Sequence, residues 1–227
     1  MSTVSVRGLV RHYTQGDVVV KALDGVDLDL GEGEFTTLMG PSGSGKTTLL
    51  NQIGGLDQPD QGTITIDGVE ISKLSASALA DVRLRKLGFV FQSYNLVPVL
   101  SAYENAEFVL LLQGVPAAER RERVMQTLKE VGLEGLEHRR PSELSGGQQQ
   151  RVAVARAIAG RPALVLADEP TANLDSKTSE SLIELMKSLN EEHGVTFLFS
   201  THDPMVMEAA RRVVHMRDGT IEGDEHK

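Results

Sequence analysis

The sequence predicts an α/β fold in which a mostly parallel β-sheet is covered by helices on both faces. Short apolar stretches such as "ALVLADE" (163–169) and "TFLFSTHD" (196–203) alternate with longer amphipathic stretches, which is typical of a parallel sheet buried between helices. A glycine-rich turn at 40–47 joins one such strand to a helix. The chain has 227 residues, of which 40% are hydrophobic and 24% charged, so it can bury the core of one large domain.

The N-terminal third predicts antiparallel strands followed by the first strand–turn–helix unit. Residues 3–10 and 18–30 alternate in polarity like strands of a half-buried antiparallel sheet. The stretch "EFTTLMG" (34–40) predicts a buried strand, and 46–56 the helix after it. Residues 62–68 predict another strand. Residues 75–88 predict a helix stopped by Gly88, and "FVFQ" (89–92) the end of a buried strand.

The middle of the chain, from about 93 to 160, has helical patterns but little strand signal. In 116–132, Pro116 suits the first helical position, Val124, Leu128 and Val131 fall on one face, and Gly132 ends the run. We therefore expect a helical subdomain inserted into the α/β core.

The C-terminal third returns to strands and helices. After the strand at 163–169, residues 176–194 predict an amphipathic helix, and 196–203 a second buried strand. The inward positions of that helix are Leu182, Ile183, Met186 and Leu189. Residues 212–221 predict a terminal hairpin that turns at Asp218 and Gly219.

Composition narrows the class of protein. The net charge is −9, which argues against a nucleic-acid partner, and the absence of cysteine excludes disulfides and thiolate metal sites. No stretch reaches the roughly 18 apolar residues of a membrane span, and "MSTVSVRG" has no apolar signal segment. We expect a soluble protein that stays where it is made.

The turn "GPSGSGKT" matches the phosphate-loop pattern G-x-x-x-x-G-K-[ST] at every fixed position. Glycines let several N–H groups point at one anion, and the following helix adds about half a positive charge at its N-terminus. Lys46 supplies a full charge, and the Thr47 hydroxyl can ligate Mg²⁺. The alternative is a glycine-rich surface loop, but a strand before and a helix after favour a P-loop NTPase core. The expected nucleotide-binding residues here are Gly40, Pro41, Ser42, Gly43, Ser44, Gly45, Lys46, Thr47 and Thr48.

Polar side chains follow three predicted strands at their C-terminal ends, the edge where open parallel sheets bind ligands. Asp168 and Glu169 end one strand, so Asp168 can hold Mg²⁺ while Glu169 deprotonates a water. His202 and Gln92 end two others, and a glutamine can ligate Mg²⁺ weakly. The alternatives are a solvated strand end or helix cap for the carboxylates, a structural role for His202 and a solvated strand exit for Gln92.

A second glycine turn lies a hundred residues further on, in "ELSGGQQQRVAVARA" (143–157). Ser145, Gly146 and Gly147 precede a helical run, as in a helix N-terminus prepared for an anion. This turn has no lysine of its own, so it suits a lid over a phosphate better than a cradle. A simple N-cap by Ser145 is the local alternative.

Together these stretches resemble one family over essentially the whole chain. The motifs "GPSGSGKT", "FQ" (91–92), "LSGGQ" (144–148), "LVLADEP" (164–170), "ANLD" (172–175) and "STHD" (200–203) occur in the order found in the nucleotide-binding subunit of an ABC transporter. The resemblance implies that residues 1–227 form a single nucleotide-binding domain. It also implies ATP and Mg²⁺ as cofactors, ATP hydrolysis, integral-membrane permease subunits as partners and a cytoplasmic location at the inner face of the membrane.

The resemblance also assigns roles to residues. Two subunits would pack head to tail in an ATP-dependent homodimer, so that the LSGGQ residues of one close on the nucleotide of the other. The residues concerned are Ser145, Gly146, Gly147 and Gln148. Lys46 would bind phosphate, Thr47, Gln92 and Asp168 the metal, Glu169 would be the general base, and His202 would contact the γ-phosphate. Asp175 would lie at the dimer interface, and Tyr13 would stack on adenine, unless it is an ordinary strand aromatic.

Longer shared stretches, such as "GGLDQPDQGTITIDG" (54–68) and "RPSELSGGQQQRVAVARA" (140–157), resemble the ATPases of lipoprotein-releasing and macrolide-exporter-like systems. Alternatives are a regulatory ABC module of the cell-division type and the ATPase of a small-solute importer. A third is a soluble ABC ATPase acting on DNA or ribosomes, which usually has coiled-coil arms or two ABC domains in one chain.

Overall fold

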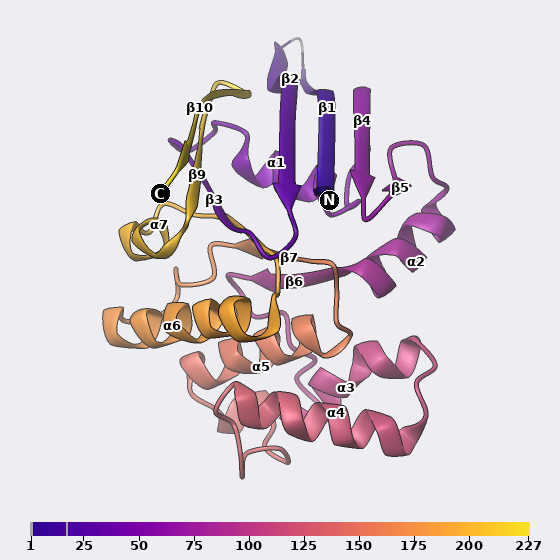
Figure 1. Ribbon diagram of the computed structural model, residues 1–227, viewed down its shortest axis with the longest axis vertical. Coiled ribbons are helices and arrows are strands. Elements are labelled where there is room, and N and C mark those ends of the chain that lie inside the picture. The colour runs from indigo at the N-terminus through magenta and orange to yellow at the C-terminus, as the bar shows by residue number, and fades with distance from the viewer. Residues whose placement is uncertain (1, 17) are drawn as a thin grey trace.

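The computed structural model describes residues 2–16 and 18–227 and has the predicted α/β fold with two sheets (Figure 1). The antiparallel sheet has the strand order β2-β1-β4-β5, formed by β2 (Val18–Gly31), β1 (Ser2–Gln15), β4 (Gln61–Ile66) and β5 (Val69–Glu70). The larger sheet has the order β10-β9-β3-β8-β7-β6. Its strands are β10 (Thr220–His226), β9 (Arg212–Arg217), β3 (Phe35–Met39), β8 (Phe197–Ser200), β7 (Leu164–Asp168) and β6 (Leu87–Phe91). All are parallel except β10, which forms the predicted terminal hairpin with β9.

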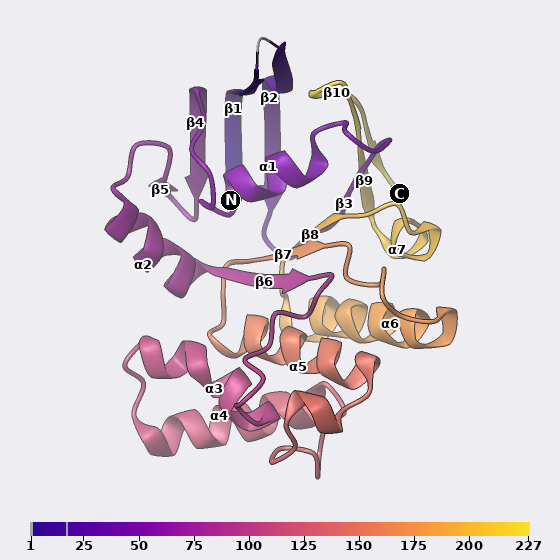
Figure 2. The same cartoon turned by 180° about the vertical axis from the view of Figure 1, so that it is seen from behind.

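The helices cover the parallel sheet from both sides. Helix α1 (Lys46–Ile53) contacts strands of both sheets and lies between them (Figure 2). Helix α2 (Ala76–Lys86) leads into β6, and α7 (Pro204–Ala209) into β9. The opposite side is covered by α3 (Ala102–Leu112), α4 (Ala117–Glu130), α5 (Gly146–Ala159) and α6 (Ser176–His193), with a short 3-10 turn at Pro141–Glu143, and α7 packs beside α6 on this side.

Two apolar cores follow from this arrangement. One joins the antiparallel sheet, α1 and one face of the parallel sheet, and the other joins the second face to α3–α7. Strands β7 and β8 are therefore apolar up to their last residues, Asp168 and Ser200, because both faces are covered. In β2 the final residues alternate between buried and exposed, because only one face of that sheet packs on the core.

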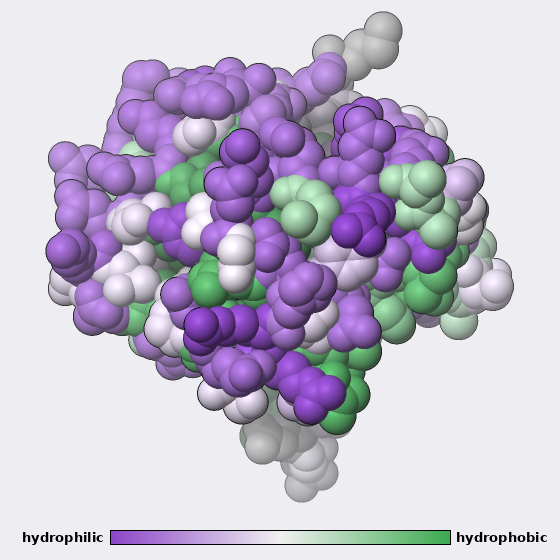
Figure 3. Space-filling view, turned by 90° about the horizontal axis from the view of Figure 1, so that it is seen from below, coloured by the Kyte–Doolittle hydropathy of each residue, from purple (hydrophilic) through white to green (hydrophobic). Residues whose placement is uncertain are grey.

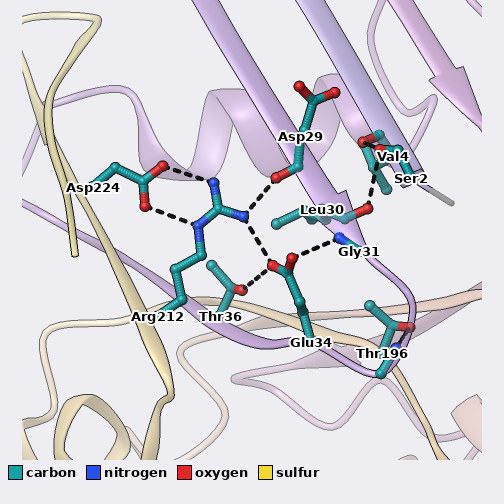
Figure 4. A network of polar contacts seen from close by, with 11 residues as sticks. Ser2, Val4, Asp29, Leu30, Gly31, Glu34, Thr36, Thr196, Arg212 and Asp224 are labelled. Carbon is teal, nitrogen blue, oxygen red and sulfur yellow. Dashed lines mark hydrogen bonds and ion pairs between the residues drawn. The ribbon is translucent and has the colours of Figure 1, made fainter. Parts of the chain in front are cut away.

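Arg212 of β9 ties the two sheets together (Figure 4). Its guanidinium donates to both carboxylate oxygens of Asp224, at 2.8 and 2.7 Å, to Glu34 Oε2 at 2.9 Å and to the Asp29 carbonyl at 2.6 Å. The Arg212 side chain is 9% exposed. A buried guanidinium is tolerated here because carboxylates on two sides neutralise it and accept its hydrogen bonds. The network sets the start of β3, and thus the strand that presents the glycine turn.

Two local expectations differ from the structure, and one short helix was not predicted. Gly88 does not stop a helix: α2 ends at Lys86 and passes directly into β6, where Gly88 lies within the strand. A Cβ at Gly88 would lie 2.5 Å from the Ala157 carbonyl oxygen, so the glycine serves close packing of α5 on β6. Pro116 is the N-cap of α4 rather than its first residue. Helix α7, only six residues long, lacked a detectable period.

The stretch 93–160, which the structure describes throughout, holds α3, α4, α5 and no strand. These helices share their core with β7, β8 and α6, and the expectation that they form an inserted subdomain remains a prediction. Within residues 2–16 and 18–227, no helix is long and apolar enough to cross a membrane. The face seen from below is largely hydrophilic, with hydrophobic residues in small groups (Figure 3).

Candidate functional site

The glycine turn between β3 and α1 is held against backbone on two sides. Gly40, Gly43 and Gly45 have φ of +156°, +81° and +102°, conformations that L side chains rarely adopt. A Cβ at Gly40 would lie 2.1 Å from the Met216 carbonyl oxygen, and one at Gly45 only 2.4 Å from that of Ala22. Both positions require glycine, so the loop has one shape set by β2 and β9.

The loop presents groups that fit an anion. Nζ of Lys46 donates to the carbonyls of Gly40 at 2.7 Å and Pro41 at 3.0 Å, which holds the ammonium over the turn. Ser44 is 2% exposed, and its Oγ has no hydrogen-bond partner among the described residues. Gly45 begins α1 without a side-chain cap. A bound phosphate would accept hydrogen bonds from these donors and interact favourably with the positive end of the helix.

Thr47 and Asp168 meet across the sheet edge. Thr47 Oγ1 lies 3.3 Å from Asp168 Oδ1. Burial raises the pKa of Asp168, against the hydrogen bonds from Ser200 and Thr47, and the adjacent Glu169 raises it further. No group of three or more His, Cys, Asp or Glu able to hold a metal occurs in the described part of the chain. A hard cation here would therefore have a hydroxyl and one carboxylate as protein ligands, a donor set that suits Mg²⁺ completed by phosphate and water.

Glu169 is held by the C-terminal end of β8. It has a φ of +45°, and its N–H donates to the Ser200 carbonyl at 2.8 Å. Nδ1 of His202 lies 2.7 Å from Oε1, and the Thr201 hydroxyl donates to Oε2 at 3.1 Å. An unusual backbone conformation and a fixed carboxylate are common at functional sites. A role for Thr201 was not predicted from the sequence. Its position directly before His202 is the feature that could have indicated one.

The His202 side chain is exposed, whereas the Gln92 side chain is hydrogen-bonded to a neighbouring loop. The His202 side chain is 78% exposed, so Nε2 is open to a ligand. Gln92 follows Phe91, which pairs with Asp168, so the glutamine lies beside the site. Its side chain donates instead to Asn173 Oδ1 at 3.4 Å, and Asn173 donates to the Gln92 carbonyl at 3.0 Å. The structure thus brings Thr47 and Asp168 together and leaves Gln92 one strand away.

The second glycine turn lies apart from this site. Ser145 caps α5 in a capping box: its Oγ accepts from Gln148 N–H at 3.3 Å, and Gln148 Oε1 accepts from Ser145 N–H at 2.9 Å. No hydrogen bond in residues 2–16 and 18–227 joins 145–148 to 40–48. Added Cβ atoms at Gly146 and Gly147 would lie 2.9 Å from Tyr94 Oη and 2.4 Å from Thr178 Cγ2, so these two side chains would have to shift to accommodate them.

Gln150 connects the helix of the second turn to the strand ends of the first site, and the sequence did not single it out. Its buried amide donates to the carbonyls of Phe91 at 3.3 Å and Pro170 at 2.7 Å. The two carbonyls flank Gln92 and Glu169 in the sequence. These two hydrogen bonds fasten the start of α5 to the loops after β6 and β7.

Two further predicted residues have local partners. Tyr13 is 39% exposed and donates its hydroxyl to Asp57 Oδ2 at 2.8 Å. Asp175 caps α6, accepting from the N–H and hydroxyl of Thr178 at 3.0 and 2.7 Å. Hydrogen bonds from Thr178 lower the pKa of Asp175.

Known proteins share this arrangement. The ABC transporter family matches residues 23–172, more than half of the chain. The chain belongs to this family. The predicted class of activity, an ABC ATPase, is confirmed with it. Solved structures of this class include the ATP-binding cassette MJ0796 of Methanocaldococcus jannaschii, a dimer described as a post-hydrolysis state bound to ADP and Pi. It is 44% identical, covers 98% of each chain and has a TM-score of 0.89.

Two curated relatives bear names of transport systems. The lipoprotein-releasing system ATP-binding protein LolD of Anaeromyxobacter dehalogenans is 47% identical over 98% of this chain and 93% of its own length. The macrolide export ATP-binding/permease protein MacB of Syntrophobacter fumaroxidans is 46% identical over 98% of this chain and 31% of its own length. This ABC ATPase therefore spans about a third of MacB and nearly all of LolD.

Proposed function

We propose that two copies of this ABC ATPase bind two MgATP molecules between them and hydrolyse them to drive a membrane permease. The observation that carries the proposal is the separation of the two glycine turns. Thr47, at the end of the phosphate loop, meets Asp168 within one chain, whereas in the described residues the Ser145 turn makes no hydrogen bond to that loop. A head-to-tail dimer would let each Ser145 turn close on the partner's nucleotide, as a lid beside a complete cradle. The dimeric MJ0796 cassette supports this arrangement.

Thr47 and Asp168 are the residues of this chain that would hold Mg²⁺, since their oxygens face each other at 3.3 Å. When bound, the ion supplies positive charge to the β- and γ-phosphate oxygens. Lys46 would exchange its two carbonyl partners for phosphate oxygens. Gln92 would reach the metal only after leaving Asn173, which would make it a sensor of the nucleotide rather than a permanent ligand.

Glu169 would orient and deprotonate the attacking water. Its carboxylate is held by Thr201 and His202, so its position is set before ATP binds. With Nδ1 turned to an ionised carboxylate, that nitrogen carries a proton, and the exposed Nε2 faces outward. Nε2 is therefore the ring nitrogen left to contact a γ-phosphate oxygen.

The permease partner would dock on the helical stretch. Large hydrophobic side chains are exposed there on the loop before α3 and on α3 itself: Val97, Val99, Phe108, Leu111 and Leu112. In the sequence these residues lie between Gln92 and α5, and α3 contacts α5, so a partner seated on α3 would respond to movement of α5. The similarity to LolD and MacB favours lipoprotein release or macrolide-type export, with this subunit at the cytoplasmic face of the membrane.

A complementation experiment tests the shared site. One chain carries Lys46→Ala and the other Ser145→Arg, and each alone should be inactive. In a mixed dimer, the intact phosphate loop of one chain meets the intact Ser145 turn of the other, so one site of two is complete. Half of the dimers in an equal mixture are mixed, so the activity should be about a quarter of the native value. A mixture as inactive as its components would contradict the proposal.

A further inference from the structure

The stretch "GGLDQPDQG" (54–62) is unused by the mechanism above, yet two of its carboxylates form ion pairs with Arg11 close to Tyr13. It follows α1 directly: the N–H groups of Gly54 and Leu56 donate to Leu50 and Asn51 carbonyls at 2.8 and 2.9 Å. Asp57 and Asp60 then turn toward β1. The cluster therefore begins where the phosphate-loop helix ends.

Arg11 of β1 forms ion pairs with the carboxylates of Asp57 and Asp60. Its Nε and Nη2 donate to the two oxygens of Asp57 at 2.8 and 3.0 Å, a bidentate pair, and its Nη1 donates to Asp60 Oδ1 at 2.9 Å. Asp60 also accepts from the His12 N–H at 2.6 Å and donates its own N–H to the Val10 carbonyl at 2.9 Å. The loop is thus fastened to β1 on both sides of Arg11. The Arg11 side chain is 22% exposed, so the pairing is partly shielded from water.

The same cluster holds the Tyr13 ring. The Arg11 guanidinium carbon lies 4.6 Å from the ring centroid, in cation–π geometry, and the Tyr13 hydroxyl donates to Asp57 Oδ2 at 2.8 Å. One ring face is therefore covered by Arg11 and the far end of the ring is fixed by Asp57. Burial and the Asp57 acceptor raise the pKa of Tyr13, so the phenol keeps the proton it donates. With 39% of the residue exposed, Tyr13 still has surface open to solvent for a flat ligand.

We propose that Arg11, Asp57 and Asp60 are positioning residues that fix Tyr13 as the stacking platform for the nucleotide base. The inference rests on the proposed function, in which Tyr13 stacks on adenine. An exposed tyrosine on a strand loses rotamer freedom when a base stacks on it, and here the protein has already restricted that freedom. Immobilising one such side chain changes affinity by about two- to tenfold. Because Asp57 follows α1, the base platform and the phosphate loop are also joined through one short rigid helix.

The test separates base binding from phosphate binding. Dissociation constants for ATP and for inorganic tripolyphosphate, both with Mg²⁺, are measured by isothermal titration calorimetry for the native chain, Arg11→Gln and Tyr13→Ala. The double variant completes a cycle. Arg7→Gln is the matched control, since Arg7 lies on the same strand and donates to both oxygens of Asp29 at 2.8 and 2.6 Å, away from Tyr13. Urea unfolding confirms that each variant is folded, and Asp57→Asn serves as a second, nearly isosteric variant.

Arg11→Gln and Asp57→Asn should weaken ATP binding about two- to tenfold and leave tripolyphosphate binding unchanged. Arg7→Gln should change neither constant, and Arg11→Gln should have no effect in the Tyr13→Ala background. Equal loss for ATP and tripolyphosphate, or an Arg11→Gln chain that matches the control, would overturn the inference. If Tyr13→Ala leaves the ratio of the ATP and tripolyphosphate dissociation constants unchanged, Tyr13 does not bind the base. That result would refute the assignment of Tyr13 in the proposed function, on which the inference rests.

Discussion

Replacing Glu169 with glutamine separates hydrolysis from closure of the dimer. The carboxylate accepts from His202 and Thr201 at 2.7 and 3.1 Å, and its N–H holds the Ser200 carbonyl. Glutamine keeps the shape and one acceptor, so Glu169→Gln should fold normally. Loss of a general base lowers the rate about 10²- to 10⁴-fold, or about 3–5 kcal/mol in the barrier. Removing a negative charge near the γ-phosphate also strengthens ATP binding, by up to about 4 kcal/mol for charges some 4 Å apart.

The assay has two readouts. Phosphate release gives the rate, and light scattering after gel filtration gives the mass with and without MgATP. Glu169→Gln should release phosphate at the background rate and elute as a dimer only with ATP. Glu184→Gln, an exposed change on α6, is the matched control and should behave as the native chain. Hydrolysis by Glu169→Gln at the native rate would refute the role given to Glu169. Lost hydrolysis without an ATP-bound dimer would refute the link between hydrolysis and opening.

Three further changes test the frame around the site. Burial raises the pKa of Asp168 above its ordinary value of 3.8, so the unfolded chain ionises this group at a lower pH than the folded chain does. The free energy of unfolding therefore falls as pH rises from 3.8 through the folded pKa. Asp168→Asn should therefore raise the free energy of unfolding at neutral pH and flatten its pH dependence in urea titrations, while abolishing ATP hydrolysis. Gln150→Ala removes the donor to two carbonyls and leaves a cavity, so urea unfolding should give a free energy of unfolding lower by about 2–4 kcal/mol. Gly88→Ala would place a Cβ 2.5 Å from the Ala157 carbonyl oxygen and push α5 away from β6. Thermal unfolding should therefore show a free energy of unfolding lower by about 1–3 kcal/mol or more.

Periodicity and motif spacing were sufficient for most of the fold. The apolar strands β3, β7 and β8 were predictable because both of their faces are buried, and α6 because its inward residues recur at helical spacing. The prediction that Gly88 stops a helix was wrong, because glycine both ends helices and permits close packing in strands. Only tertiary contacts distinguish these two roles. Six-residue α7 is too short to show a period.

The candidate site was predictable to the level of residue types at strand ends. The meeting of Thr47 with Asp168 follows from the parallel topology, and the structure agrees. The partners of Glu169 and Tyr13 were not predictable, because Thr201, Arg11 and Asp57 act through side-chain orientation. Asp57 is 46 residues from Arg11, and no local pattern reports such a contact.

The central claim is that each chain completes its neighbour's nucleotide site, and a crosslink tests it most directly. The chain has no cysteine, so Ser42→Cys and Ser145→Cys can be made as two separate single-cysteine chains, each with Glu169→Gln. Under mild oxidation, an equal mixture should form a disulfide-linked dimer with MgATP and none without it, and neither chain alone should form the Ser42–Ser145 link. A chain carrying both cysteines that crosslinks only within itself, with no linked dimer in the mixture, would contradict the account.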